Sequence, residues 1–390
     1  MNVRYGILQG TFWAAMCVVI AFFVQLFKAF GYDTMQCCVI SACGTAALIL
    51  SQPVWGALCD RAKRVRPVLL TALVLGMFSS LLFLLGGRSI YVMILGVVAF
   101  SSTFRALMYI YDTWAVRLRN DGAKLEFGIT RSCGSFCYAL TAALFGLAID
   151  RFGTGIIVPV FLVLALIVAV ITMTIPEAPP SVRTDDRLSL RRGLSGLLKN
   201  REYIVLLVSL FLVFSASNGF ILFLPYRIYE LGGTDAHYGY ATFVMAISEI
   251  PALLLYKKIS ARISARTILC ISFFFVSAKI FSTALFDNLT VVILCQLFQA
   301  PSYGLYLCAI SNYIPTVVPR SFVFTAQTVL SAVVAGLAPF CAYILMGILS
   351  NSFPASVVIG AAGVFPLLGC GLMTSFVLIS GKKKPSAKIL

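Results

Sequence analysis

The stretch WGALCDR (residues 55–61) ends one long apolar run, and YKKISAR (residues 256–262) ends another run 201 residues later. The same offset relates Gly31 to Gly232 and Gly146 to Gly347. A constant offset between similar segments is the mark of an internal repeat. The chain is therefore predicted to consist of two similar halves.

Apolar runs fill most of the 390-residue chain, which is 60% hydrophobic and 11% charged, with a mean hydropathy of +0.98. A helix that spans a bilayer needs about 20 mostly apolar residues. Twelve runs meet this length: 6–28, 34–58, 67–86, 90–115, 129–149, 154–175, 203–224, 238–256, 267–286, 289–313, 321–348 and 355–379. The runs are continuous rather than alternating, so the spans are expected to be helices with internally bonded backbones. The first run lacks a cleavage site of small residues and is expected to remain as a membrane helix.

The predicted fold class is therefore an all-α integral membrane protein with twelve transmembrane helices in two six-helix repeats. The repeats are parallel because the offset spans an even number of helices. We expect an N-terminal bundle at 1–175, a linker at 176–202, a C-terminal bundle at 203–381 and a basic tail at 382–390. The linker, PEAPPSVRTDDRLSLRRGLSG, is polar and proline-led, with a surface helix expected near Leu190 to Leu198.

The basic residues lie mainly on one predicted side of the membrane. Of the 30 Lys and Arg residues, 23 fall in loops and ends on one side and four on the other. This asymmetry predicts that both termini and the linker are cytoplasmic, in a multi-pass cytoplasmic membrane protein. The net charge of +16 is then expected to face anionic lipid head groups. Nucleic-acid binding is excluded because no soluble domain is available to carry it.

The twelve cysteines lie inside the spans or, for Cys59, at the end of one, which is typical of small packing residues. No Cys-x-x-Cys or paired-histidine spacing occurs, and the only histidine, His237, falls in a short loop. We therefore expect no metal site and no other cofactor.

Five charged residues fall well inside the spans: Asp112, Glu249, Arg105, Arg131 and Lys279. A charge at the bilayer centre costs at least about 2.5 to 3.5 kcal/mol on insertion scales, so such residues usually face a cavity and pair with one another. The alternative is that they are buried ion pairs which only fix the register of the helices. Buried pairs seldom add net stability, which favours a function.

Helical rise places two of these charges at a similar depth on adjacent antiparallel helices. Asp112 lies five residues before Arg117, and Arg131 lies seven residues after Lys124. Both are about 8 to 10 Å deep, so they are expected to pair. Arg105 lies nearer the middle, on the same helix face as Tyr109.

The second half repeats this arrangement near the midplane of the membrane. Glu249 comes eight residues before Lys257, and Lys279 comes thirteen residues after Arg266. Each half thus offers one acid and at least one base at the depth of a substrate cavity. A carboxylate whose basic partner can be exchanged for substrate is a natural proton carrier.

The segment GALCDRAKRVR (residues 56–66) resembles the loop signature of the major facilitator superfamily. That superfamily places a substrate site between two six-helix halves near the membrane midplane. The resemblance implies that Gly56, Asp60, Arg61 and Arg64 form a cytoplasmic gate, in which Asp60 can cap a helix N-terminus. The alternative is a solvated basic turn.

The segment EFGITR (residues 126–131), followed by Tyr138, resembles helix five of the lactose permease group and the related nucleoside symporters. The resemblance implies that Arg131 pairs with the helix-four carboxylate Asp112 and binds sugar hydroxyls, while Tyr138 stacks on the ring. SEIP (residues 248–251) resembles helix eight of that group, which implies that Glu249 binds sugar and is coupled to protonation. Lys279 stands where the group usually has an arginine.

Helix ten departs from this pattern, because ILCQLFQAPSYGLY (residues 293–306) lacks the group's histidine and proton-carrying glutamate. Gln296 and Gln299 are there instead, so a carried proton would have to reside on Glu249, tuned by Lys279, or on Asp112. Other polar side chains are candidates for the cavity, although each is more often a packing residue. They are Tyr303, Tyr306, Asn218 and Asn312, while Gln299 is expected to contact the substrate.

The sequence predicts a secondary active transporter for a small polar solute, a sugar or a nucleoside, coupled to protons and acting as a monomer. The alternative is a proton-driven efflux antiporter for drugs or sugars. A membrane enzyme is disfavoured because no catalytic His/Asp pair lies inside the membrane. A channel is disfavoured because the polar groups are isolated pairs rather than a continuous ring.

Overall fold

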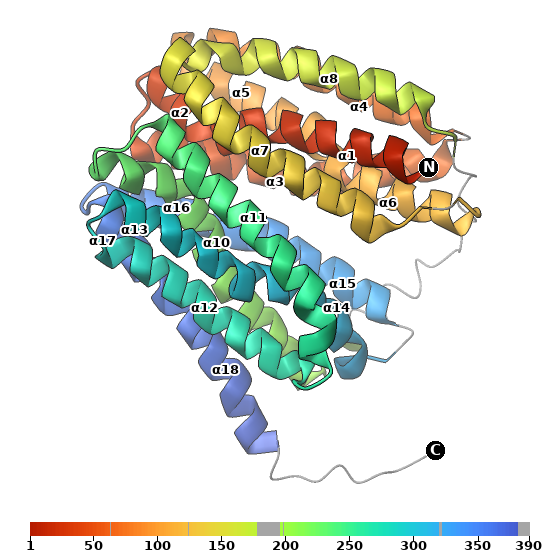
Figure 1. Ribbon diagram of the computed structural model, residues 1–390, viewed down its shortest axis with the longest axis vertical. Coiled ribbons are helices and arrows are strands. Elements are labelled where there is room, and N and C mark those ends of the chain that lie inside the picture. The colour runs from red at the N-terminus through yellow and green to blue at the C-terminus, as the bar shows by residue number, and fades with distance from the viewer. Residues whose placement is uncertain (63, 124, 178–195, 198, 320–321, 381–390) are drawn as a thin grey trace.

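The computed structural model describes residues 1–62, 64–123, 125–177, 196–197, 199–319 and 322–380. Within these ranges, twelve helical stretches are long and apolar enough to span a bilayer, and the chain is a multi-pass membrane protein. Figure 1 shows two layers of long helices, with the first half above and the second below. Most of the predicted linker and the basic tail lie outside the described residues.

Several spans are built from more than one helical segment. The helices of the first half are α1 (Asn2–Met16), the π-turn η1 (Cys17–Ala21), α2 (Phe23–Ala29), α3 (Thr34–Arg61), α4 (Val65–Leu81), the 3-10 segment η2 (Leu82–Arg88), α5 (Ile90–Phe100), the π-turn η3 (Ser101–Arg105), α6 (Leu107–Asn120), α7 (Phe127–Phe152), η4 (Thr154–Ile156) and α8 (Ile157–Thr174).

The second half follows the same plan. Its helices are α10 (Arg201–Glu230), α11 (Asp235–Ser260), α12 (Ala265–Leu285), α13 (Leu289–Cys295), the 3-10 segment η5 (Gln296–Gln299), the π-turn η6 (Ala300–Gly304), α14 (Leu305–Val317), α15 (Val323–Ala332), the π-turn η8 (Val333–Leu337), α16 (Ala338–Ser350), α17 (Ala355–Ala362) and α18 (Val364–Ser380).

The 201-residue offset recurs in the turns that start α3 and α11. Gly31 and Gly232 both have positive φ, of 82° and 75°, a conformation that glycine adopts without steric cost. Two residues further on in each half, Asp33 caps α3 with Gln36, and Thr234 caps α11 with His237, in reciprocal capping boxes. The repeat predicted from the sequence is therefore reproduced in backbone conformation and in caps.

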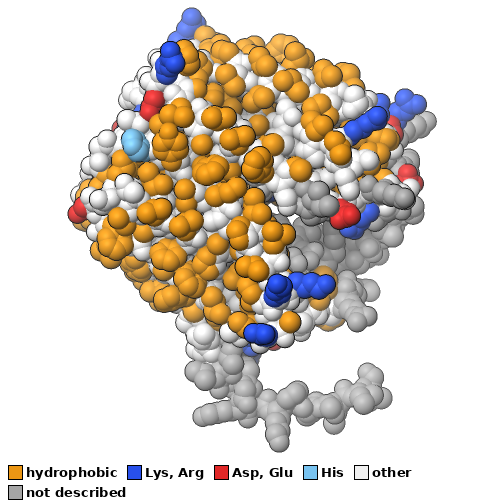
Figure 2. Space-filling view, viewed as in Figure 1, with side chains coloured by type: hydrophobic (Ala, Val, Ile, Leu, Met, Phe, Trp, Pro, Cys, Tyr) orange, Lys and Arg blue, Asp and Glu red, His pale blue; other side chains and the backbone are white. Residues whose placement is uncertain are grey.

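The surface matches a protein embedded in lipid. Figure 2 shows a face covered largely by hydrophobic side chains, with Lys and Arg mainly at its margins. Large apolar side chains such as Leu50, Tyr91 and Leu254 are at least 75% exposed, which in water would favour aggregation. In a bilayer these side chains lie against acyl chains.

The two halves meet most closely near the end of the molecule opposite the amino terminus. Here α7 packs on α11, and α3 packs on α16. Oδ1 of Asp150, near the end of α7, accepts from the backbone N–H of Asp235 (2.9 Å), and its Oδ2 accepts from the hydroxyl of Thr234 (2.6 Å) and the N–H of Ala236 (3.1 Å). This carboxylate thus caps the start of a helix in the other half.

Glycines permit the close crossing of α7 and α11. A Cβ on Gly146 would lie 2.6 Å from the carbonyl oxygen of Asp235, and a Cβ on Gly239 would collide with the carbonyl of Ala142. At the other crossing, a Cβ on Gly347 would lie 2.8 Å from Cβ of Cys38. The 201-residue offset relates Gly146 to Gly347 and Cys38 to Gly239, so the two crossings correspond to each other. In Figure 1 the layers diverge from this end towards the amino terminus.

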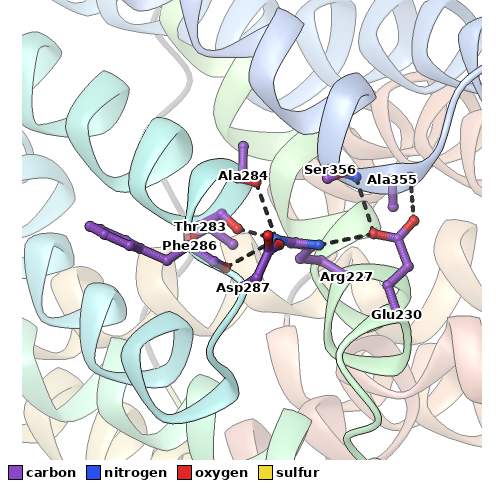
Figure 3. Close-up of polar contacts among 8 residues, drawn as sticks. All are labelled: Arg227, Glu230, Thr283, Ala284, Phe286, Asp287, Ala355 and Ser356. Carbon is purple, nitrogen blue, oxygen red and sulfur yellow. Dashed lines mark hydrogen bonds and ion pairs between the residues drawn. The ribbon is translucent and has the colours of Figure 1, made fainter.

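A polar cluster around Arg227 joins three helices at the same end of the second half (Figure 3). The buried guanidinium of Arg227 in α10 donates to the carbonyls of Thr283, Ala284 and Phe286 at 3.0–3.2 Å, where α12 ends. It also contacts Oδ1 of Asp287 at 2.6 Å. Glu230 accepts from the N–H groups of residues 355 and 356 at the start of α17. The cluster satisfies helix ends that would otherwise lack partners.

Candidate functional site

A cavity of about 400 Å³ lies between the two halves, within the size range of small-molecule sites. Both halves contribute to its lining, from α1, the π-turn η3, α7, α10, α11, α12 and the η5–η6 segment. A smaller cavity of about 70 Å³ adjoins it, and Arg105, Ile20, Ala21, Ile221 and Tyr238 border both. Four of the five intramembrane charges named in the sequence analysis line this cavity: Arg105, Arg131, Glu249 and Lys279.

Most of the candidate residues line this cavity. They are Arg105, Arg131, Tyr138, Glu249, Lys279, Gln299 and Tyr303, together with the further candidates Asn218 and Tyr306. Asp112, Tyr109 and Asn312 are not among the lining residues. Asn312 instead donates to the hydroxyl of Tyr256, outside the cavity.

Gln299 connects the acid and the base of the second half. Its Nε2 donates to Oε1 of Glu249 (2.8 Å), and its Oε1 accepts from Nζ of Lys279 (2.5 Å). A glutamine side chain can do both, because one end donates and the other accepts. The predicted meeting of Glu249 and Lys279 therefore takes place through an amide, and Lys279 also lies over the ring of Phe220 at 4.9 Å.

The acid and base of the first half are separated in a similar way. Nε2 of Gln9 donates to Oδ1 of Asp112 (3.1 Å), and Nε1 of Trp13 donates to Oε1 of Gln9 (3.0 Å). The guanidinium of Arg131 lies over the Trp13 ring, 4.1 Å from its centroid.

The direct ion pair between Asp112 and Arg131 that depth arithmetic predicts is not formed, although the charge of Arg131 acts on Asp112. The separation arises across the bundle and not along the membrane normal. The two residues are at matching depth, but α1 inserts the side chains of Gln9 and Trp13 between them.

Arg105 ends the π-turn η3, where the helix locally contains a wider turn. Such turns are frequent at functional sites. Its neighbour Phe104 anchors the turn in the core of the first half, with its ring 4.7 Å from that of Phe161. Arg105 borders both cavities, whereas Tyr109 and Asp112 are not among the lining residues. The charge of Arg105 still acts on Tyr109, one helical turn further on.

Aromatic rings form much of the remaining wall. Tyr138 packs edge-on against Trp13 (6.1 Å, 72°), and Tyr303 lies beside Tyr306 (6.0 Å) and Phe214 (6.2 Å). A wall of rings with a few charged groups suits a polar solute that also has an apolar face.

The predicted gate residues lie at the open end, away from the crossing of the halves. Gly56, Arg61 and Arg64 are exposed, and a Cβ on Gly56 would meet nothing within 4 Å. The side chain of Asp60 lies outside the described residues. The gate interpretation stays a prediction, because the described residues show exposure but no gate contact.

The sequence interpretation missed Trp13, which lines the cavity, and the buried Gln9, which accepts a hydrogen bond from it. The signal for Gln9 was its amide within an apolar span, a position where polar groups are usually retained for contacts. Among the described residues, no group of three or more His, Cys, Asp or Glu side chains could hold a metal ion.

Comparison with known proteins gives one family match and several relatives. The sequence model of the family described as "MFS_1 like family" matches residues 5–358. The maltose permease of Geobacillus stearothermophilus is 28% identical over 299 residues, which cover 75% of this chain and 73% of that protein.

Solved transporter structures share the fold. The nucleoside transporter NupG aligns with a TM-score of 0.84 at 13% identity, over 96% of this chain and 98% of that one. A D-xylose-proton symporter aligns with a TM-score of 0.71 at 15% identity, over 95% of this chain and 96% of that one. At these identities the likeness establishes the arrangement of the twelve helices.

Proposed function

Because the chain belongs to the MFS_1 like family of major facilitator transporters, we propose that it moves a sugar or a nucleoside across the cytoplasmic membrane by alternating access. The observation that carries the proposal is the cavity between the halves, lined from both sides by charged and aromatic groups. The names of the maltose permease, NupG and the D-xylose-proton symporter support a sugar or nucleoside as the solute.

The conformation supports an alternating-access mechanism. The halves are closed together by Asp150 and the glycine crossing at one end, and they diverge at the amino-terminal end. With both termini cytoplasmic, as the basic residues indicate, this is an inward-open state. A single chain builds the whole cavity, which supports action as a monomer.

In the proposed binding mode, charged groups bind solute hydroxyls and rings stack on its apolar face. Arg131 and Glu249 supply charge-assisted hydrogen bonds, and Gln299 and Tyr303 supply neutral ones. Tyr138 supplies the stacking surface. Asp112 and Tyr109 act indirectly, Asp112 by holding Gln9 and Trp13 beneath Arg131.

We assign proton coupling to Glu249. Its carboxylate accepts from Gln299, and the charges of Lys279 and Arg131 act on it. When Glu249 takes up a proton, that attraction is lost and its O–H becomes a donor for the solute. Glu249 can exchange its hydrogen bond with Gln299 for one with a solute hydroxyl, and this exchange links solute binding to the protonation of Glu249.

The test is transport into proteoliposomes with an imposed pH gradient. Wild-type protein is expected to accumulate labelled solute, and Glu249→Gln is expected to lose accumulation at least tenfold while retaining equilibrium exchange. Glu126→Gln, which changes an exposed carboxylate at the start of α7, serves as the matched control. Uptake that ignores the gradient and is unchanged by Glu249→Gln would remove the coupling, and gradient-driven export would favour the efflux alternative.

A further inference from the structure

The charges that line the cavity do not balance. Three cations, Arg105, Arg131 and Lys279, border it, whereas Glu249 is the carboxylate among its described lining residues. That carboxylate is connected through Gln299 to Lys279. In the second half, the negative charge of Glu249 therefore balances the positive charge of Lys279. The excess positive charge belongs to the two arginines of the first half.

The positive charge of Arg131 is partly balanced by its neighbours. It lies over the Trp13 ring, and the charge of Asp112 is nearby but held by Gln9. A cation over an aromatic face is attracted less strongly than a cation in a buried ion pair. Its N–H groups thus have capacity left for an acceptor in the cavity.

Arg105 is not compensated by any carboxylate. In the part of the chain that the structure describes, no hydrogen bond or ion pair joins its guanidinium to another residue. Its charge acts on Tyr109, Tyr138 and Tyr343, whose hydroxyls are neutral. The guanidinium borders both cavities.

Arg227 shows how the same chain treats an arginine whose role is structural. It contacts three backbone carbonyls and the carboxylates of Asp287 and Glu230. Arg105 lies further from the helix ends and has none of these contacts. An unpaired charge within the membrane is costly and is retained where a solute or ion meets it.

A bound anion would supply the missing partner. The planar guanidinium matches a carboxylate or phosphate with two parallel N–H···O bonds, which are stronger than bonds to neutral hydroxyls. We propose that the transported solute carries a carboxylate or phosphate that binds Arg105, with Arg131 adding positive potential. Building on the function proposed above, the solute is an acidic sugar or nucleotide whose ring lies among Tyr138, Tyr303 and Glu249.

Three hexoses that differ only at carbon 6 test this proposal: glucose, glucuronate and glucose 6-phosphate. Uridine and uridine monophosphate form a second pair. Binding to purified wild-type protein is expected to be at least tenfold tighter for an acidic member than for its neutral partner. The two acidic hexoses distinguish a carboxylate site from a phosphate site.

Variants locate the effect at Arg105. Arg105→Gln is expected to abolish the preference, and Arg105→Lys to retain part of it because the charge remains. Arg88→Gln removes an exposed arginine outside the cavity and is expected to change nothing. A preference that survives Arg105→Gln, or neutral and acidic members that bind equally well, would overturn the anion proposal and leave sugar or nucleoside transport standing.

A separate arm uses simple anions without a sugar. Millimolar phosphate or acetate is expected to raise the melting temperature of wild-type protein but not of Arg105→Gln, because ligands stabilise the state they bind. If the anions stabilise but neither solute series binds, the anion site stands and the sugar or nucleoside assignment fails. If neither anion stabilises the wild type, the anion site itself is refuted.

Discussion

Gln299 decides how the acid and base of the second half interact. It stands between Glu249 and Lys279, donating to one and accepting from the other. With the amide in place, both charged groups stay close to the cavity without forming a direct ion pair. A weaker, exchangeable connection of this kind lets solute hydroxyls compete for Glu249.

Gln299→Met is expected to reduce solute exchange at least tenfold. The substitution keeps the volume but removes both hydrogen bonds, so Lys279 and Glu249 either collapse into a direct pair or lose partners at a cost of about 1–3 kcal/mol each. Exchange of labelled solute in proteoliposomes measures the effect.

Gln296→Met is the matched control for this substitution. Gln296 is also buried in η5, but it donates only to Thr283 and Val292 and does not line the cavity. Equal losses of exchange in the two variants would mean that the Gln299 bridge has no special role.

The sequence predicts the depth of charged residues well but not their lateral partners. Counting from helix ends places Glu249 and Lys279 near each other, because rise along a helix is regular. The same count places Asp112 beside Arg131, yet Gln9 and Trp13 from α1 come between them. The packing of helices in three dimensions decides which neighbouring helix inserts a side chain between two charges. Residue spacing along the sequence does not reveal that packing.

At the scale of elements, helix limits were predictable where caps or loops mark them. The spans end near the predicted residues, and Gly31 and Gly232 lie in turns that start equivalent helices. The π-turns were not predicted, because neither SSTFR (Ser101–Arg105) nor APSYG (Ala300–Gly304) interrupts its apolar span, and the spans were read as regular helices. Arg105 is the last residue of one of these turns and borders the cavity.

Arg227 ties α10 to the end of α12, and Glu230 ties α10 to the start of α17. Arg227→Gln is expected to lower the free energy of unfolding by about 1–3 kcal/mol, because buried carbonyls lose their charged donor. The lower part of this range is expected if water reaches the helix ends. Thermal unfolding in detergent measures the change, with the exposed Arg262→Gln as control.

Solute binding, measured beside thermal unfolding, separates structural from functional arginines. Arg227→Gln should leave solute binding unchanged once the protein is folded. Arg105→Gln should weaken the binding of acidic solutes without loss of stability. A drop in binding for folded Arg227→Gln would mean that the cluster in Figure 3 affects the cavity.

At the scale of the whole molecule, the crossing of α7 and α11 holds one end of the cavity closed. Gly239→Ala is expected to force these helices apart, since the new methyl group would collide with the carbonyl of Ala142. Overpacking of this kind costs about 1–3 kcal/mol, enough to shift the population of the described state about five- to 160-fold.

Hydrogen–deuterium exchange measures this shift. Faster exchange is expected at the end of α7 and the start of α11, where Asp150 caps the opposite half. Gly155→Ala is the matched control, because a Cβ there would meet nothing within 4 Å. Exchange rates that stay at wild-type values in Gly239→Ala would show that the crossing does not hold the two halves together.

The position of the glycine crossing also sets a mechanical ratio for the transporter. At 1.5 Å per residue, Gly146 lies about 28 Å from the start of α7 and about 9 Å from its end. If α7 pivots rigidly at Gly146, it works as a lever with arms in a ratio of about three to one. A small parting at the Asp150 end then drives a threefold larger closure at the amino-terminal end, so small movements at the short arm control access to the cavity.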